Sequence, residues 1–151
     1  SSTVTIQNGQ VTSPTAGGCS MTLTFSGLST NASATMTTQL TAPSGLPTAS
    51  ANQIPNGFSG SGTAVFYVTF KLSSSLTVST SPTIAMTVPT LTSGNNFFQS
   101  FSDTGPANVV AGGYGNSGII SGNTVTFQGG GGSGGQTLTS GDTYVLSLVY
   151  F

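Results

Sequence analysis

The sequence predicts an all-β protein that folds as an antiparallel β-sandwich of about seven to nine short strands. Apolar residues make up 35% of the 151-residue chain and occur in alternating runs rather than scattered along it. Thr, Val, Phe and Tyr, which favour strands, are abundant, whereas the helix formers Glu and Arg are absent and Lys occurs once. The alternating runs are separated by segments rich in Gly and Pro, which are typical of turns.

The N-terminal part of the chain alternates clearly but is interrupted. Residues 3–11, TVTIQNGQV, predict a strand with a turn or bulge at Asn8-Gly9. A proline and paired glycines then break the pattern over residues 12–18. We therefore expect residues 1–18 to be an N-terminal strand extension with its linker, and residues 19–151 to be the sandwich domain.

The other strands are predicted where apolar residues recur at every second position. These runs cover residues 19–28, 34–40, 64–72, 83–88, 95–103, 118–128 and 142–151. Met36 and Leu40 are expected to point inward, and residues 121–123, SGN, are expected to form a tight hairpin turn. Residues 42–62 predict a long loop, a feature that often marks a binding or interface loop.

Charged side chains are almost absent from this chain. Lys71, Asp103 and Asp142 are the only ones, 2% of residues against about 25% in ordinary soluble domains. One lysine cannot neutralise several phosphates, so we expect no nucleic-acid partner and no attraction to an anionic membrane surface. No apolar run reaches the roughly 18 residues of a membrane helix, and no signal peptide is present. We expect no membrane insertion.

The residues needed for common catalytic chemistry are missing. Without His, a Ser-His-Asp arrangement cannot exist. The single Cys19 allows no internal disulfide, and it shares a face of its predicted strand with Met21 and Leu23. We expect it to be a buried thiol, because no neighbouring cation or His activates it. We expect no catalytic residue, no cofactor and no metal site.

Asp103 and Asp142 are the only acids, so an acid/base glycosidase would need both of them. They lie in SDTGP and SGDTY, and we expect each carboxylate to bond its own turn. A calcium site made by both residues and nearby carbonyls is an alternative that the sequence leaves open. Zinc is excluded for want of His and Cys ligands.

Four segments carry a resemblance to a known family. They are VFYVTFKLSSSLTV (65–78), PTIAMTVP (82–89), SGNTVTFQ (121–128) and LTSGDTYVLSLVYF (138–151). With them the chain resembles the immunoglobulin-like domain of secreted bacterial surface proteins over about residues 64–151. The resemblance implies an immunoglobulin-like sandwich and an extracellular, cell-surface location, with the signal peptide already removed. It implies no activity and no catalytic residues. A jelly-roll-like arrangement fits the same strand pattern.

The closing strand is apolar on both faces. One face carries Tyr144, Leu146, Leu148 and Tyr150, and the other carries Val145, Val149 and Phe151. A strand of this kind must be covered on both faces. Sheet edges are usually protected by charges, and this chain has a single lysine. Glycans, covering loops or pairing with another copy are therefore expected to hide its edges.

Pairing with another copy predicts a function. Residues 1–11 could enter a neighbour's groove as an added strand, with Val4, Ile6 and Val11 as the inserted side chains. The groove would be lined by the closing strand through Tyr144, Leu146, Leu148, Tyr150 and Phe151. The chain also resembles, more weakly, the pilins that exchange N-terminal strands, in its penultimate aromatic Tyr150. The sequence thus predicts the structural subunit of an extracellular, pilus-like filament, a homopolymer built by donor-strand exchange. The alternative is that residues 1–11 form the first strand of their own sandwich.

A second hypothesis is a monomeric adhesive or carbohydrate-binding surface module with glycans as partners. Tyr114, in the Gly-rich segment AGGYGNSG, and the loop 42–62 would then lie near the ligand. Asn31, in the triplet NAS, fits the acceptor pattern for N-glycosylation.

Overall fold

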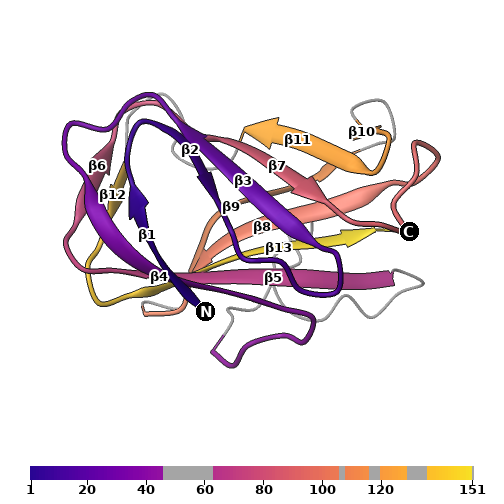
Figure 1. The fold of residues 1–151 in the computed structure, drawn as a ribbon, viewed down its shortest axis with the longest axis horizontal. Coiled ribbons are helices and arrows are strands. Elements are labelled where there is room, and N and C mark those ends of the chain that lie inside the picture. Colours follow the sequence, from indigo (N-terminus) through magenta and orange to yellow (C-terminus); the bar gives the residue numbers. More distant parts are fainter. Residues whose placement is uncertain (46–62, 106–107, 116–119, 129–135, 151) are drawn as a thin grey trace.

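The chain folds into two large facing β-sheets and one small sheet (Figure 1). The computed structural model describes residues 1–45, 63–105, 108–115, 120–128 and 136–150, and in these residues it contains thirteen strands and no helix. All strand pairs in the sheets are antiparallel. The all-β antiparallel sandwich predicted from the sequence is therefore confirmed.

The larger sheet has six strands in the order β1-β4-β5-β13-β8-β9. Their bounds are β1 Ser2–Ile6, β4 Ala32–Gln39, β5 Thr63–Leu72, β13 Thr143–Tyr150, β8 Phe97–Asp103 and β9 Asn108–Gly115. The closing strand β13 thus lies in the middle of the sheet, whereas β1 and β9 form its two edges (Figure 1).

The second sheet has five strands in the order β10-β11-β7-β3-β2. Their bounds are β10 Ile120–Ser121, β11 Thr124–Gln128, β7 Thr83–Thr87, β3 Ser20–Phe25 and β2 Gly9–Thr12. The small sheet pairs β12 (Gln136–Leu138) with β6 (Leu76–Val78). The first two strands of the chain therefore belong to different large sheets.

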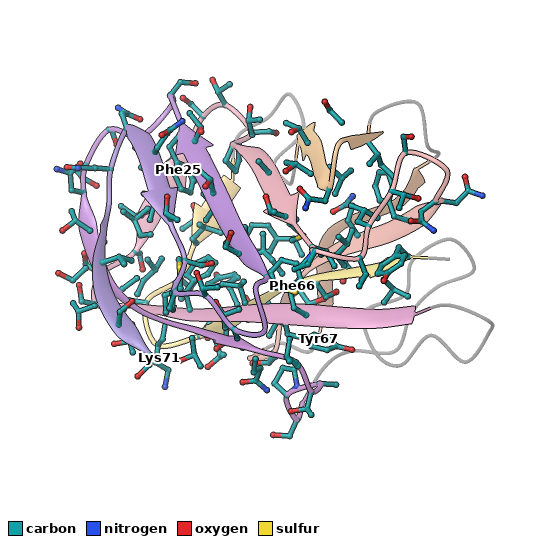
Figure 2. All side chains as sticks on the ribbon, turned by 45° about the vertical axis from the view of Figure 1, so that its right-hand side comes forward. Phe25, Phe66, Tyr67 and Lys71 are labelled. Atoms are coloured by element: carbon teal, nitrogen blue, oxygen red, sulfur yellow. The ribbon has the colours of Figure 1, made fainter. Side chains whose placement is uncertain are left out.

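One apolar core draws on strands of both large sheets, and its members follow the period-2 pattern of the sequence. On β3, Met21, Leu23 and Phe25 are buried, while the residues between them are half-buried. On β5, Phe66 is buried in the core and Lys71 is exposed on the outer side (Figure 2). Each buried side chain of this size stabilises the fold by roughly 1.5–3 kcal/mol.

The Pro- and Gly-rich segment between β2 and β3 is a hairpin turn, not a linker. Ala16 and Cys19 exchange two backbone hydrogen bonds, of 3.1 and 2.9 Å. Between them, Gly17 (φ 57°) and Gly18 (φ 78°) adopt the left-handed conformation that two-residue hairpins require. Residues 1–18 accordingly contribute two strands to the sandwich instead of standing apart from it.

Other details differ from the sequence-based expectation. Residues 111–115 of the Gly-rich segment around Tyr114 belong to β9, which was not expected as a strand, and β12 was not expected either. Leu40, expected to point inward, is 50% exposed because β4 ends one residue earlier. The predicted SGN turn is confirmed, since Ser121 pairs with Thr124 and Gly122 has a φ of 62°.

Candidate functional site

The first two predicted donor residues lie on β1, which is packed onto its own domain. β1 pairs with β4 along its whole length, from Ser2 opposite Met36 to Ile6 opposite Ala32. Val4 is half-buried against the core, and Ile6 is 1% exposed. Val4 and Ile6 therefore lie beside Ala34 and Ala32 of β4, on the face of the sheet that packs into the core.

The third predicted donor residue, Val11, lies on β2 at the edge of the other large sheet. It is 5% exposed and pairs with Leu23 of β3. The predicted donor segment is thus split between two sheets. Within this single chain, residues 1–11 supply strands of their own sandwich, and insertion into a second copy stays a prediction.

Asn8 fixes the point at which the chain passes from one sheet to the other. Its side-chain Nδ2 donates to the carbonyl of Leu28, and the Leu28 N–H donates back to Asn8 Oδ1, both at 3.0 Å. The next residue, Gly9, has a φ of 105°, which a residue with a side chain rarely adopts. The Asn8–Leu28 pair thus acts as a clamp at the start of β2.

The predicted acceptor strand β13 has both of its edges occupied, by β5 and by β8. Tyr144, Leu146, Leu148 and Tyr150 belong to the core, and the residues between them are buried as well. Because β4 and β5 lie between β13 and β1 in the sheet, the predicted donor strand β1 does not pair with the predicted acceptor strand β13. Phe151 lies outside the described residues.

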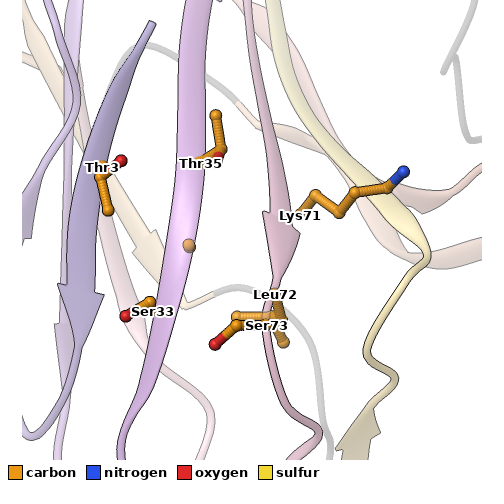
Figure 3. A pocket seen from close by; sticks show the side chains of 7 residues that line it. Thr3, Ser33, Thr35, Lys71, Leu72 and Ser73 are labelled. Atoms are coloured by element: carbon orange, nitrogen blue, oxygen red, sulfur yellow. The ribbon is translucent and has the colours of Figure 1, made fainter.

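A shallow surface depression of about 220 Å³ lies on the outer side of β1, β4 and β5 (Figure 3). Thr3, Thr35 and Lys71 form a row across these strands, because they pair with one another in register. The lining is Thr3, Ser33, Ala34, Thr35, Lys71, Leu72 and Ser73. Lys71 extends away from Thr3 and Thr35 towards β13 (Figure 3). Pockets that enclose small ligands are larger, about 300–1,000 Å³.

The fold brings together the only two acids of the chain, which are far apart in sequence. Asp103 ends β8, Asp142 directly precedes β13, and their carboxyl groups lie close enough to interact. Asp103 Oδ1 also accepts the N–H of Gly105 at 2.9 Å, which is the turn bond expected from the sequence. The Tyr144 hydroxyl accepts the Thr139 N–H at 2.7 Å and lies close enough to Asp103 to act on the pKa of that carboxyl, in the lowering direction.

Burial and the neighbouring Asp142 carboxyl together raise the pKa of Asp103 above its ordinary value. Burial is the larger cause, because it disfavours the charged form of Asp103. The hydrogen bond to Asp142 and the negative charge of that residue act in the same direction, while the Gly105 N–H opposes them. Two carboxyl groups in this position can share one proton.

The described part of the chain contains no group of three or more His, Cys, Asp or Glu side chains that could hold a metal ion. The calcium alternative would therefore have to rely on the Asp103–Asp142 pair and on uncharged oxygens. None of the described residues forms a helix with the length and apolar character needed to cross a membrane.

The remaining candidate residues lie apart from one another. Cys19 is a free, buried thiol, and burial raises its pKa. Asn31 is exposed next to the start of β4. An aromatic side chain that binds a sugar must be exposed, and Tyr67 of β5 is buried. Tyr114 is in β9, and its side chain lies outside the described residues.

Comparisons with protein-family models, with curated proteins and with solved structures find no match to this chain. The interpretation of the site therefore rests on geometry. Sequence reasoning missed the Asn8–Leu28 clamp, because the Asn8-Gly9 turn signal marked the position but not the partner. It considered Asp103 and Asp142 together only as the acids that a glycosidase would need and as an open calcium alternative, and nothing in the local sequence indicated that the fold would bring them together.

Proposed function

We propose that this chain is the structural subunit of an extracellular, cell-surface filament whose copies join head to tail by exchanging β1. The observation that carries the proposal is the place of β1 at the edge of its sheet, where β4 is its single neighbouring strand. The same strand from another copy can replace it, because that strand offers identical backbone groups and side chains. The acceptor is then the edge of β4, not β13.

The surface under β1 favours taking up a strand. The positions of β4 that pair with the inward side of β1 are Ala32, Ala34 and Met36, which are at most 5% exposed. Without β1, the backbone edge of β4 beside these apolar side chains would face water. An exposed edge of this kind recruits another strand.

The outer edge of β1 carries none of the usual protections against pairing. Its sequence, STVTI, has no charge and no proline, and its pairing with β4 runs without a bulge. Natural sheet edges depend on such features to prevent association. The composition of β1 therefore favours pairing with another strand.

Head-to-tail exchange joins two different surfaces, the β1 strand of one copy and the β4 edge of the next. Where the rotation between successive copies does not close, such a contact builds an open fibre rather than a ring or a dimer, and this fibre is the assembly we propose. The nearly uncharged chain, with a formal net charge of −1, offers little repulsion to close packing of copies. The extracellular location rests on the resemblance to secreted bacterial surface proteins.

Negative-stain electron microscopy of the concentrated protein tests the proposal. We expect fibres with a subunit-scale axial repeat from the 151-residue chain, and also from Thr126→Ala, whose exposed side chain lies on β11 of the other large sheet. A variant without residues 1–7 should stay monomeric, with circular dichroism used to check that it folds. Discrete monomers of the intact chain at every concentration would overturn the proposal. That result would favour a monomeric adhesive or sugar-binding module, to be tested next on glycan arrays.

A further inference from the structure

We infer that the unit exchanged between copies is β1 alone, residues 1–7, and that the chain from Asn8 onward stays with its own domain. This inference rests on the proposed function and names its moving part and its partner, the β4 edge of a second copy. It narrows the donor segment, because Val11 then remains in its own core and only Val4 and Ile6 enter the neighbour.

The clamp at Asn8 sets the boundary of the exchanged unit. Asn8 satisfies both the N–H and the carbonyl of Leu28, at 3.0 Å each. Moving Asn8 with β1 would leave these two backbone groups of a buried residue without their partner. Moving the chain only as far as residue 7 keeps both bonds in place.

Beyond the clamp, the chain is tied to its own domain at several further points. Val11 is 5% exposed and Ser13 is also 5% exposed. The Ser13 N–H donates to the Met21 carbonyl at 2.8 Å, and the Met21 N–H donates to Ser13 Oγ at 2.9 Å. Thr38 Oγ1 donates to the Pro14 carbonyl at 2.6 Å. Releasing β2 would break all of these contacts, so β2 is a poor candidate for exchange.

Fewer contacts hold β1 to its own domain than hold β2. In the described part of the chain, no side chain of β1 makes a hydrogen bond, and only Val4 and Ile6 of this strand pack against the core. Its remaining ties are the backbone bonds to β4, which a second copy reproduces. Seven extended residues span at most about 25 Å. The β4 edge of the accepting copy must therefore lie within that distance of Asn8.

Two cysteine pairs distinguish the moving strand from the fixed one, each in a Cys19→Ser background. Thr3→Cys with Thr35→Cys joins β1 to β4, because these residues are opposite each other and exposed. Thr12→Cys with Thr22→Cys joins β2 to β3, where the native hydroxyl oxygens lie 3.4 Å apart. Fibres of each variant are oxidised and run on a denaturing gel without reductant.

We expect a ladder of covalently linked chains from the β1–β4 pair and a single monomer band from the β2–β3 pair. Ladders from both pairs would overturn the boundary at Asn8, because β2 would then cross between copies as well. Monomer bands from both pairs in intact fibres would overturn exchange while leaving a filament built by other contacts. Absence of fibres in the chain with Cys19→Ser alone would overturn the proposed function and this inference with it.

A second measurement does not depend on the cysteine variants folding. A synthetic peptide of residues 1–7, SSTVTIQ, is added to the chain that lacks these residues. We expect the peptide to raise the thermal unfolding temperature by several degrees, and a peptide with Val4→Asn and Ile6→Asn to leave it unchanged. No rise with the native peptide would show that the β4 edge does not accept β1 as a separate strand, and would overturn the inference.

Discussion

Asp103 and Asp142 are the most informative single residues of this chain, because they are its only acids and the fold places them in contact. The chain has no His and one Lys, so little else titrates between acid and neutral pH. The pKa of Asp103 is raised by burial and by Asp142. The stability of the folded protein against pH should therefore report on this pair.

We predict that the protein is more stable in acid than at neutral pH. The raised pKa means that folding favours protonated Asp103, so its contribution is fully present below the ordinary value of 3.8. That contribution is lost as the pH rises through the raised pKa of the folded form. The urea unfolding midpoint, measured from about pH 3 to pH 7, should fall across this range.

The matched control for this prediction is Asp142→Asn. It keeps a hydrogen-bonding partner beside Asp103 and removes the negative charge. The pH dependence should become weaker, and the variant should be more stable than the parent at neutral pH. A midpoint of the parent that rises towards neutral pH would instead mean that the folded form favours ionised Asp103.

Asn8 offers a second prediction, based on its two hydrogen bonds to Leu28. Replacing it in Asn8→Ala leaves two backbone groups of Leu28 unpaired. We expect a loss of about 1–3 kcal/mol in the free energy of unfolding, measured by urea denaturation. The control is Asn31→Ala, since Asn31 is exposed and should change stability by less than about 0.5 kcal/mol. Equal effects of the two substitutions would contradict the clamp.

Among the elements, the central place of β13 in its sheet explains why its sequence is apolar on both faces. It lies between β5 and β8, and its residues from Tyr144 to Tyr150 are buried on both sides of the sheet. Phe70 stacks on Tyr144 with ring centroids 5.4 Å apart, and Phe101 meets Tyr144 edge-on at 5.7 Å. The two apolar faces thus reflect a central strand.

We predict that truncation in the centre of β13 is far more costly than truncation at the edge. Leu146 is fully buried, so Leu146→Ala should lower the free energy of unfolding by about 2–5 kcal/mol. Thr5→Ala on β1 alters an exposed side chain and should cost less than about 0.5 kcal/mol. Chemical denaturation of both variants checks the contrast. Similar losses would show that β13 does not hold the centre of the fold.

The strands predicted from the sequence are those whose alternation is strong, such as β3 and β5. β9 was missed because its sequence, NVVAGGYG, contains three glycines, which have low strand propensity. Pairing with β8 stabilises this strand, and partners of that kind cannot be read from a local window. The same reason applies to the Asp103–Asp142 contact. Its two residues are separated in the chain by β9, β10, β11 and β12.

At the scale of the whole molecule, the outer face of the five-stranded sheet carries many hydroxyl groups. On the five-stranded sheet, Thr22, Thr24, Thr83 and Thr87 occupy the outward positions between buried residues. Some of these hydroxyl groups pair across strands, as Thr87 Oγ1 does with Thr124 Oγ1 at 2.9 Å. Cohesion between such surfaces depends on hydrogen bonds and apolar contact, with almost no contribution from ion pairs.

This surface predicts that both the fold and the proposed fibre are insensitive to salt. Between 0.01 M and 1 M NaCl the screening length falls from about 30 Å to about 3 Å, which weakens exposed ion pairs. With one Lys and two mutually paired Asp, the chain has little to lose from that screening. The unfolding temperature and the fraction of protein pelleted as fibre should therefore change little over this range.

Loss of pelleted fibre in high salt, with an unchanged unfolding temperature, would locate the contact between copies at Lys71 and a neighbouring acid instead of at β1. The variant Lys71→Gln separates the two cases, because exchange of β1 predicts fibres without the charge and an ionic contact predicts none.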